Sequence, residues 1–425
     1  MKLNSVRKLL VIISCSGLFI CLLVILNCSS SRDNENDLIT IDLKNLIQNE
    51  CEVPISQFVE NLEYTLLELT PESGIFFIKK IYATDEYFIV FNSSPGSANH
   101  LLLFDRRSGK YIREVGERGI GPEEYARPLD CFFNSFDNKI YAYGSMRSSV
   151  KNYNLEGNFI ESFVTPGYNE TSVNGYLPID AFLDSVSYIG YIENSTGQVS
   201  KRVVIFSKDK EIMNFPHYEK WTSDGSGNQY ISIEEPVFFS WGNEVSFKER
   251  SNDTIFKVTK NKLIPRLVLY SGNLRCPYKL SREEAVEQLT KPKDYFEALN
   301  IFESSGYLFF DLASKNNPIE GKPASFKLIR NLCVFDKTTK KAYACKNNYE
   351  TINSCLTDDL NNFMPIAPIS ITGNNELVAV LQAIEIKKWI TDNPQGFSEL
   401  RKKMPWLVNI TEIDNPVIVT AKLKK

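Results

Sequence analysis

The chain has 425 residues, of which 43% are hydrophobic and 12% aromatic. This composition supplies enough apolar material for a folded core and excludes a disordered tail protein. Phe and Tyr are abundant, with 27 and 20 residues, and both favour the half-buried surface of a β-sheet. The formal net charge of −4 argues against nucleic acid as a partner, because nucleic-acid-binding surfaces are basic.

The N-terminal segment is predicted to direct export. Three cations in the first eight residues precede an apolar run over residues 9–26, and the chain turns polar directly after Cys28. This is the order of features in a secretory signal. An apolar run of this length would also span a bilayer, so an uncleaved signal anchor is the structural alternative.

Cys28 favours a lipid-anchored product. A cysteine at the end of an export segment, followed by a polar run, resembles the bacterial lipoprotein signal, in which that cysteine is acylated after cleavage. Asn27 departs from this signal, which usually has Gly, Ala or Ser before the cysteine. We expect residues 1–27 to be a signal peptide, residues 28–50 to be a linker after the anchor, and residues 51–425 to be the folded domain.

The cysteines beyond the leader do not predict a metal site. They are Cys51, Cys131, Cys276, Cys333, Cys345 and Cys355. None forms a CxxC pair, and their wide spacing without His partners argues against zinc. An oxidising compartment permits disulfides, but the spacing assigns none, and buried thiols on strands are the expected state. Cys333 and Cys345 flank a predicted hairpin turn and are candidate neighbours.

From about residue 60 onward the sequence predicts one β-hairpin after another. A first unit has apolar runs at 87–91, 101–104 and 111–115, and a second has runs at 139–143, 150–153 and 159–163. The units align when Gly109-Lys110-Tyr111-Ile112 is placed on Gly157-Asn158-Phe159-Ile160, an offset of 48 residues. Four-stranded propeller blades repeat at about this period.

Weaker copies of this unit continue towards the C-terminus. Their apolar runs are at 187–192, 202–206, 237–241, 244–247, 254–258, 263–270, 307–312, 326–335, 341–345, 366–371, 376–382 and 417–423. Together with the first two units they make about six, so the predicted fold is an all-β, six-bladed β-propeller. Isolated hairpins are unstable in water, whereas radial packing of several sheets buries both faces of each.

Two stretches break the β pattern and are predicted to be short helical insertions. Ser281 to Glu284 has the form of a capping box, and the segment continues to Thr290 without Gly or Pro. Residues 383–390 are the second candidate and end before Pro394. Such insertions fill a gap between blades or shape a binding face.

A glycine-rich segment carries a resemblance to a known family. Its sequence is Gly116-Glu117-Arg118-Gly119-Ile120-Gly121-Pro122-Glu123-Glu124-Tyr125. This resembles a hallmark of the six-bladed β-propeller lipoproteins of Bacteroidota, which are NHL-like propellers. Members usually have Gly-Pro-Gly-Glu where this chain has Gly-Pro-Glu-Glu, and this difference indicates a tolerant structural loop.

Other segments agree with this resemblance, which covers roughly residues 40–425. Residues 58–70 resemble the family's N-terminal strand, and residues 414–423 resemble its closing strand. The resemblance implies a ring closed by pairing of the N- and C-terminal strands. It also implies an outer-membrane lipoprotein on the periplasmic or surface face, without a defined reaction.

The same glycines do not predict a nucleotide site. A Walker loop needs Gly-Lys-Ser/Thr, and a Rossmann loop needs a strand before it and a helix after it, whereas Pro122 follows here. A tight crossing between two blades is the preferred interpretation. Four side chains would then lie at the rim of the ring, as candidate ligand contacts or as solvated groups: Arg118, Glu123, Glu124 and Tyr125.

No catalytic, cofactor-binding or metal-binding set is predicted. His100 and His217 fall in separate units, without Glu or Cys at ligand spacing. Ser145 lacks the Gly-x-Ser-x-Gly setting of a nucleophile. Calcium in a central channel stays open as an alternative, because ligands from different blades need no local motif. Its candidate ligands, near predicted blade starts, are Asp85, Asp130, Asp180 and Glu234.

Two functions remain in competition. The first is a non-catalytic binding module on a lipid anchor in the cell envelope, which holds a glycan, a peptide or an envelope protein on one face of the ring. The second is a metal-dependent hydrolase or lactonase in the central channel. Convergent carboxylates would favour the hydrolase, and an aromatic-lined face would favour the binding module. A purely structural role in an envelope complex is a third alternative. Candidate stacking platforms, if they do not merely fill space between blades, are Trp221, Trp241, Trp389 and Trp406.

Overall fold

The computed structural model describes most of the chain after the predicted leader. The described residues are 38–93, 99–119, 121, 123–125, 130–143, 149–170, 173–221, 230–232, 236–281, 284, 287, 294–318, 326–346 and 354–424. The residues from Thr40 onward belong to one unit. Within the described part, no helix has both the length and the apolar character needed to cross a membrane. The predicted signal peptide and Cys28 lie outside the described residues.

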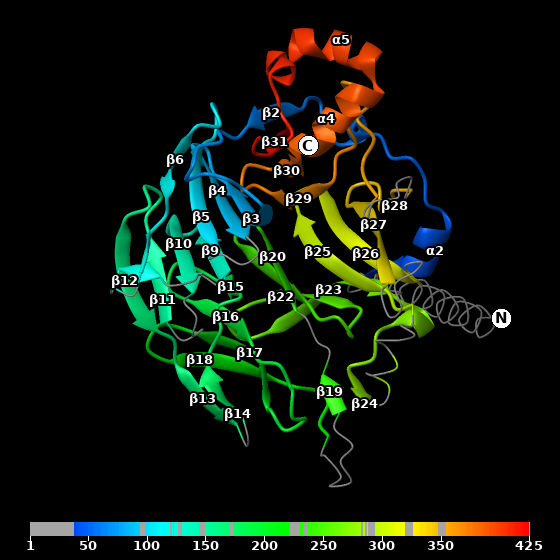
Figure 1. Ribbon diagram of the computed structural model, residues 1–425. Helices are drawn as coiled ribbons and strands as arrows, with labels where there is room; N and C mark the ends of the chain where they lie inside the picture. The colour runs from blue at the N-terminus through cyan, green and yellow to red at the C-terminus, as the bar shows by residue number, and fades with distance from the viewer. Residues whose placement is uncertain are drawn as a thin grey trace, which may run out of the picture. The chain divides into compact units, whose positions relative to one another are not determined.

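Six blade sheets are present among the described residues, five of four strands and one, the fourth, with β1 as a fifth strand, and Figure 1 shows them around a common centre. The first blade contains β3 (Phe77–Ala83), β4 (Tyr87–Ser93), β5 (His100–Asp105) and β6 (Tyr111–Glu114). The second contains β9 (Asp130–Asn134), β10 (Lys139–Tyr143), β11 (Ser149–Tyr153) and β12 (Phe159–Val164). The third contains β15 (Ala181–Phe182), β16 (Tyr188–Tyr191), β17 (Lys201–Phe206) and β18 (Glu211–Pro216).

The remaining blades keep the same order. The fourth contains β20 (Val237–Trp241), β21 (Glu244–Lys248), β22 (Thr254–Val258) and β23 (Leu263–Tyr270). The fifth contains β25 (Glu297–Glu303), β26 (Tyr307–Pro318), β27 (Phe326–Asp336) and β28 (Lys341–Ala344). The sixth contains β29 (Pro368–Ile371), β30 (Glu376–Leu381), β31 (Val417–Lys422) and β2 (Glu63–Leu66). The six-bladed propeller predicted from the repeat is confirmed.

The sixth blade closes the ring by joining the two ends of the domain. Its strand order is β2-β31-β30-β29, so the outermost strand comes from the N-terminal side of the first blade. β2 and β31 are antiparallel, with Tyr64 opposite Val419 and Leu66 opposite Val417. The closure that the resemblance implied is therefore confirmed.

The other elements decorate this ring. β1 (Ile39–Asp42) adds to β23 at the edge of the fourth blade and leads into α2 (Leu43–Gln48), so part of the expected linker is regular structure. Short strand pairs and 3-10 helices complete the described elements: β7 (Glu117–Arg118) with β8 (Glu124–Tyr125), β13 (Gly167–Glu170) with β14 (Val173–Tyr176), β19 (Tyr230–Ser232) with β24 (Lys279–Ser281), η1 (Ile55–Gln57), η2 (Gly272–Leu274) and η3 (Pro405–Val408).

Two helices follow β30. The helix predicted at 383–390 is present as α4 (Ala383–Asp392), and α5 (Pro394–Lys403) was not predicted. Pro394 ends the first helix but begins the second, because proline is tolerated at the first helical position. The helix predicted from Ser281 to Thr290 lies largely outside the described residues.

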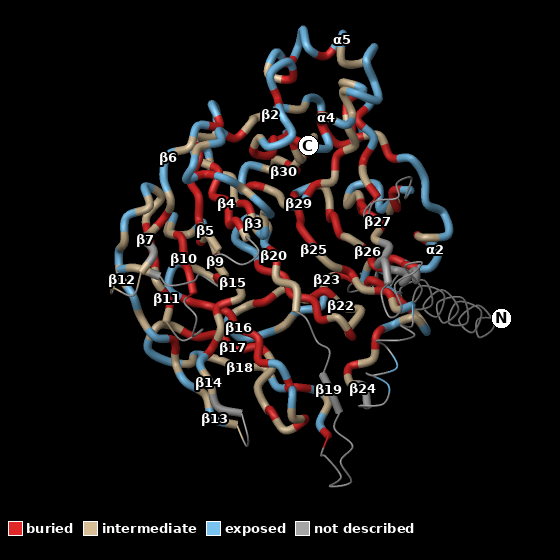
Figure 2. The backbone as a smooth tube through the Cα atoms, viewed as in Figure 1, coloured by how far each residue is buried: buried red, intermediate tan, exposed pale blue. Residues whose placement is uncertain are grey.

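The core lies between neighbouring blades. The middle strands are the most deeply buried, and Figure 2 shows them in red, with exposed positions gathered on outer strands such as β12. Between the first two blades, for example, Phe91 and Leu103 pack in one cluster with Ile140 and Tyr153. Middle strands are covered on both faces, which explains why they are continuous apolar runs in the sequence.

The predicted repeat has a backbone cause. Gly109 and Gly157, which the sequence alignment superimposes, both have positive φ angles, of 69° and 82°. Each lies in the turn that precedes an outer strand, β6 or β12. The left-handed conformation is readily adopted by glycine, so the same residue recurs in the same turn.

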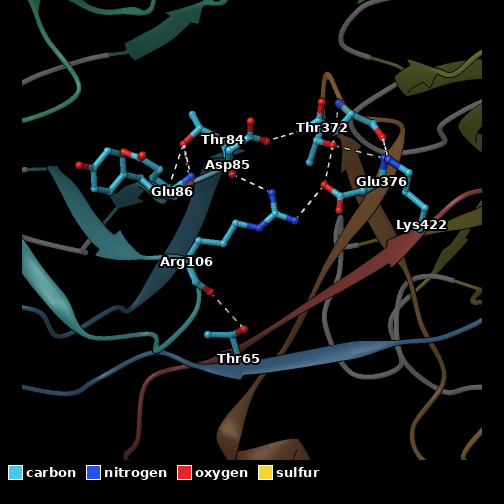
Figure 3. A network of polar contacts seen from close by, with 10 residues as sticks. Thr65, Thr84, Asp85, Glu86, Arg106, Thr372, Glu376 and Lys422 are labelled. Atoms are coloured by element: carbon cyan, nitrogen blue, oxygen red, sulfur yellow. Dashed lines mark hydrogen bonds and ion pairs between the residues drawn. The ribbon is translucent and has the colours of Figure 1, made fainter.

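Polar contacts join the first blade to the sixth at the closing seam (Figure 3). Arg106, in the turn after β5, places Nη2 2.8 Å from Oε2 of Glu376 on β30, and its Nη1 donates to the carbonyl of Thr84 at 2.7 Å. Asn374 donates to Asp85 across the same seam. The side chains of Arg106 and Glu376 are only 13% and 20% exposed, so water screens their ion pair little.

Replacement of Arg106 by Met should destabilise the closed ring. We expect Arg106→Met to lower the free energy of unfolding by about 1–3 kcal/mol, because two charge-assisted hydrogen bonds are lost. The matched control is Lys260→Met, which removes the pair between a 67% exposed lysine and Asp184. That control should cost less than about 1 kcal/mol. Chemical denaturation measures both, and equal losses would contradict the role of the seam.

His217 makes the stability of the ring depend on pH. Its side chain is buried, with Nε2 2.7 Å from the carbonyl of Ile192 and Nδ1 2.7 Å from the hydroxyl of Tyr278. Burial lowers the pKa of His217 to about 4, because it disfavours the imidazolium, and the charge of Arg202 acts in the same direction. His217 is therefore neutral at pH 7.

The unfolded chain binds a proton at His217 more readily than the folded chain does. Stability is thus complete above about pH 6.5, the usual histidine pKa, and is lost as the pH falls towards 4. Between pH 7 and pH 5 we expect a loss of about 2 kcal/mol in unfolding free energy from this residue. His217→Gln should remove that part of the pH slope, and identical slopes for both proteins would refute the assignment.

Candidate functional site

The inner strands of the six blades line one central channel. Figure 1 shows β3, β9, β15, β20, β25 and β29 nearest the centre of the ring. A cavity of 820 Å³, here called the wide mouth, lies where most of these strands begin, and a second of 390 Å³, the narrow mouth, lies where they end. Tyr82, Phe132 and Phe238 line both cavities, so the two belong to one channel.

The wall of the channel is rich in aromatic side chains. The three shared aromatic residues are joined at the narrow mouth by others, including Phe136, Phe182, Trp241 and Phe302. At the wide mouth, Phe77 contributes a ring that is 58% exposed. Aromatic side chains bring a large contact area at a low cost in conformational entropy, so this wall can receive the apolar face of a ligand.

One of the four tryptophans considered as binding platforms lines the channel. Trp241 does so, at the end of β20. Trp221 is buried, with its ring 5.8 Å from that of Tyr278, and Trp389 packs on Phe363 at 4.8 Å. Trp406 lies 6.3 Å from Tyr64, beside the closing strand. Packing accounts for these other three.

An ion pair lies at the start of the channel. Nζ of Lys80 on β3 lies 2.8 Å from Oδ1 of Asp130 on β9, so it joins the first two blades. The same ammonium lies 3.7 Å from the centroid of the Phe132 ring, in a cation–π contact. Lys80 is therefore satisfied by the protein itself.

The wide mouth brings together two of the four carboxylates considered as calcium ligands. Asp130 pairs with Lys80, and Oδ2 of Asp180 accepts the backbone N–H of Tyr191 at 2.7 Å. Asp85 instead lies at the closing seam, and Glu234 lies outside the described residues. Across the described residues, no group of three or more His, Cys, Asp and Glu side chains is arranged to hold a metal ion.

Uncharged polar side chains and two further cations, Lys79 and Arg330, complete the wide mouth. Asn300, Ser370 and Gln382 lie on its wall and can donate and accept hydrogen bonds. Arg330, on β27, also lines it, and sequence reasoning did not single this residue out. A local signal was present, because Arg330 interrupts the apolar run expected at 326–335.

The glycine-rich segment forms a crossing between the first and second blades, as predicted. β7 and β8 pair in parallel between β6 and β9. Oε2 of Glu124 accepts the N–H of Gly121 at 2.9 Å, and a Cβ atom on Gly119 would lie 1.7 Å from that same oxygen. The glycines therefore make room for the Glu124 carboxylate, which holds the loop.

Two of the four candidate rim contacts, Glu123 and Glu124, lie at a hollow other than the channel. Glu123 is exposed, and it borders a separate hollow of 650 Å³ together with Glu124. The carbonyl of Glu123 accepts the hydroxyl of Tyr153 at 3.2 Å. The side chains of Arg118 and Tyr125 lie outside the described part.

Two solved structures are similar to this propeller. An exported protein of Bacteroides fragilis NCTC 9343 aligns with a TM-score of 0.60 at 15% identity, covering 91% of this chain and 99% of its own. A DUF4221 family member from Bacteroides vulgatus ATCC 8482 aligns with a TM-score of 0.51 at 11% identity, covering 89% of this chain and 99% of its own. At these identities the likeness shows the fold alone.

The sequence itself matches a family over almost the whole propeller. Comparison with curated proteins gave no match. Residues 38–422 match the family described as a domain of unknown function, DUF4934. This span runs from the start of β1 to the end of β31, so it contains all six blades and the closing strand. The chain therefore belongs to the DUF4934 family.

Proposed function

We propose that this protein is a non-catalytic binding protein of the cell envelope, lipid-anchored at the outer membrane, which holds a glycan in the wide mouth of its channel. The observation that carries the proposal is the combination of an exposed aromatic ring, Phe77, with hydrogen-bonding side chains on the wall of an 820 Å³ cavity. Cavities of roughly 300–1,000 Å³ are typical of small-molecule sites.

The composition of the wide mouth fits a sugar. One face of a pyranose ring is apolar and packs on aromatic rings, while its edge carries hydroxyl groups. Asn300, Gln382 and Ser370 offer donors and acceptors for those hydroxyls. A peptide or a neighbouring envelope protein would use the same surface less fully, and both serve as alternative outcomes of the tests.

The proposal that the protein is exported and lipid-anchored rests on the N-terminal leader and on Cys28. The structural relative from Bacteroides fragilis is named as an exported protein, which supports the same location for this chain. The resemblance to Bacteroidota lipoproteins, which are NHL-like propellers, supports the anchor.

A channel hydrolase is the second candidate. The observation in its favour is that Asp130 and Asp180 line the same cavity. Asp130 already forms an ion pair with Lys80, and Asp180 already accepts a hydrogen bond from a backbone N–H. Because both carboxylates are engaged by the protein itself, we prefer the binding protein to the hydrolase. Removal of calcium by a chelator separates the two functions, since a lowered unfolding temperature that calcium restores would favour the hydrolase.

Replacement of Phe77 should weaken the binding of the glycan without lowering the stability of the fold. A glycan at a hundred times its dissociation constant should stabilise the full-length protein in detergent by about 2.7 kcal/mol. Phe77→Ala should weaken that glycan about tenfold, since loss of an aromatic anchor typically costs more than 1 kcal/mol. Titration calorimetry measures the affinity after a thermal-unfolding screen of oligosaccharides and peptides.

The neighbouring Phe76 provides the control. It is 66% exposed but does not line the wide mouth among the described lining residues, so Phe76→Ala should bind as the wild type does. Equal losses in both variants would place the site elsewhere. Stabilisation by peptides alone would replace the glycan with a peptide ligand.

Acylation of Cys28 is tested independently of the ligand. Metabolic labelling with a fatty-acid analogue should mark the wild-type protein and leave Cys28→Ala unmarked, because the acyl chains are attached at that sulfur. The control is Cys51→Ala, which lies beyond the predicted linker and should be labelled as strongly as the wild type. Equal labelling of Cys28→Ala would exclude the lipoprotein.

A further inference from the structure

Arg330 is a cation of the wide mouth that the protein leaves incompletely satisfied. It lies on β27 in the fifth blade, where its carbonyl accepts the N–H of Ser354 at 3.1 Å. Its side chain lines the wide mouth. The backbone of Arg330 is thus fixed by the sheet, and its guanidinium borders the cavity.

One donor of the Arg330 guanidinium is unpaired within the described part of the chain. Its Nε is buried and has no hydrogen-bond partner among the described residues. A buried donor left unpaired costs about 1–3 kcal/mol, so native structures rarely keep one without a reason such as a ligand or an ordered water. Lys80, another cation on the wall of the wide mouth, differs because Asp130 pairs with it at 2.8 Å.

The charge of Arg330 acts on Asp311, and this carboxylate is already engaged. Oδ2 of Asp311 accepts the side-chain amide of Asn300 at 2.7 Å. Burial raises the pKa of Asp311, although the bond from Asn300 and the charge of Arg330 oppose the rise. No ion pair between Asp311 and Arg330 is found within the described part of the chain, and the Arg330 side chain borders the cavity.

A planar guanidinium with free donors is suited to a planar anion. Arginine binds carboxylates through two parallel N–H···O bonds, and such bonds are about twice as strong as neutral ones. Asp180 lines the same cavity and would repel a dianion more strongly than a monoanion. The site therefore favours a ligand with a single negative charge rather than a phosphate monoester.

We infer that the wide mouth binds an oligosaccharide containing a uronic acid, whose carboxylate is held by Arg330. This rests on the proposed function, since it names the class of glycan that the same mouth would hold. Phe77 would receive the apolar face of the sugar, Asn300 and Gln382 would bind its hydroxyls, and Arg330 would distinguish an acidic sugar from a neutral one.

The test compares oligosaccharides that carry one glucuronate residue with their carboxyl-reduced counterparts, which differ only in the acid. Titration calorimetry on the full-length protein should show the acidic sugars binding at least tenfold more tightly. Arg330→Gln should reduce their affinity to that of the reduced sugars, and Arg330→Lys should restore only part of it, because lysine keeps the charge and loses the planar fork. The control is Arg107→Gln, at an exposed arginine in the turn after β5, which should bind as the wild type does.

Salt provides a measurement that needs no variant. Binding of the acidic sugars to the wild type should weaken between 50 and 500 mM sodium chloride, whereas binding of the reduced sugars should not, because salt screens only the charged contact. This comparison keeps the inference testable if Arg330→Gln does not fold.

The outcomes separate the two proposals. Equal affinity for acidic and reduced sugars, with both lost in Phe77→Ala, would overturn the role of Arg330 and leave the glycan-binding mouth standing. Tighter binding of sulfated sugars than of uronates would overturn the inference that Arg330 holds a carboxylate. Absence of binding by every sugar, acidic or neutral, would overturn both proposals.

Discussion

The pairing of β2 with β31 is the constraint on which the rest of the ring depends. Without it, β31 would carry an unpaired edge, and the first and sixth blades would have no common boundary. The turn of the first blade is built against the closing strand, since a Cβ on Gly109 would lie 2.1 Å from the carbonyl oxygen of Leu66. Glycine at that position lets the blade approach, and the Arg106–Glu376 pair then joins the two sides of the seam.

Closure turns six separate inner strands into one channel wall. An inner strand is bonded to its own blade on one side only, so its position is set by contacts with neighbouring blades. Lys80 and Asp130 make such a contact, and Arg266 with Glu303 makes another between the fourth and fifth blades. Polar and charged side chains therefore gather at the channel for two reasons, to join blades and to face the cavity. Lys80 joins two blades through its ion pair with Asp130. Arg330, whose Nε has no partner among the described residues, faces the cavity.

The strands that build the candidate site were harder to predict than those that build the core. β4 and β5 were expected at 87–91 and 101–104 and are found at Tyr87–Ser93 and His100–Asp105, because strands buried on both faces are continuous apolar runs. β3, β9 and β25 were missed, since these inner strands mix apolar residues with polar ones such as Lys80 and Asp130. For this reason, the residues that line the channel are harder to recognise from local sequence patterns than the residues of the core.

The sequence by itself determined the all-β class, the six repeated units and the helix after β30, because apolar periodicity, turn glycines and helix-forming runs act over a few neighbouring residues. The closure of the ring was expected only from the family resemblance. Only the tertiary structure decided which side chains meet at the wide mouth. Phe77, Asp180 and Arg330 lie in the first, third and fifth blades, and their distances in the chain say nothing about their distance in space. Their meeting follows from the radial order of the blades, which exists only once β2 has paired with β31.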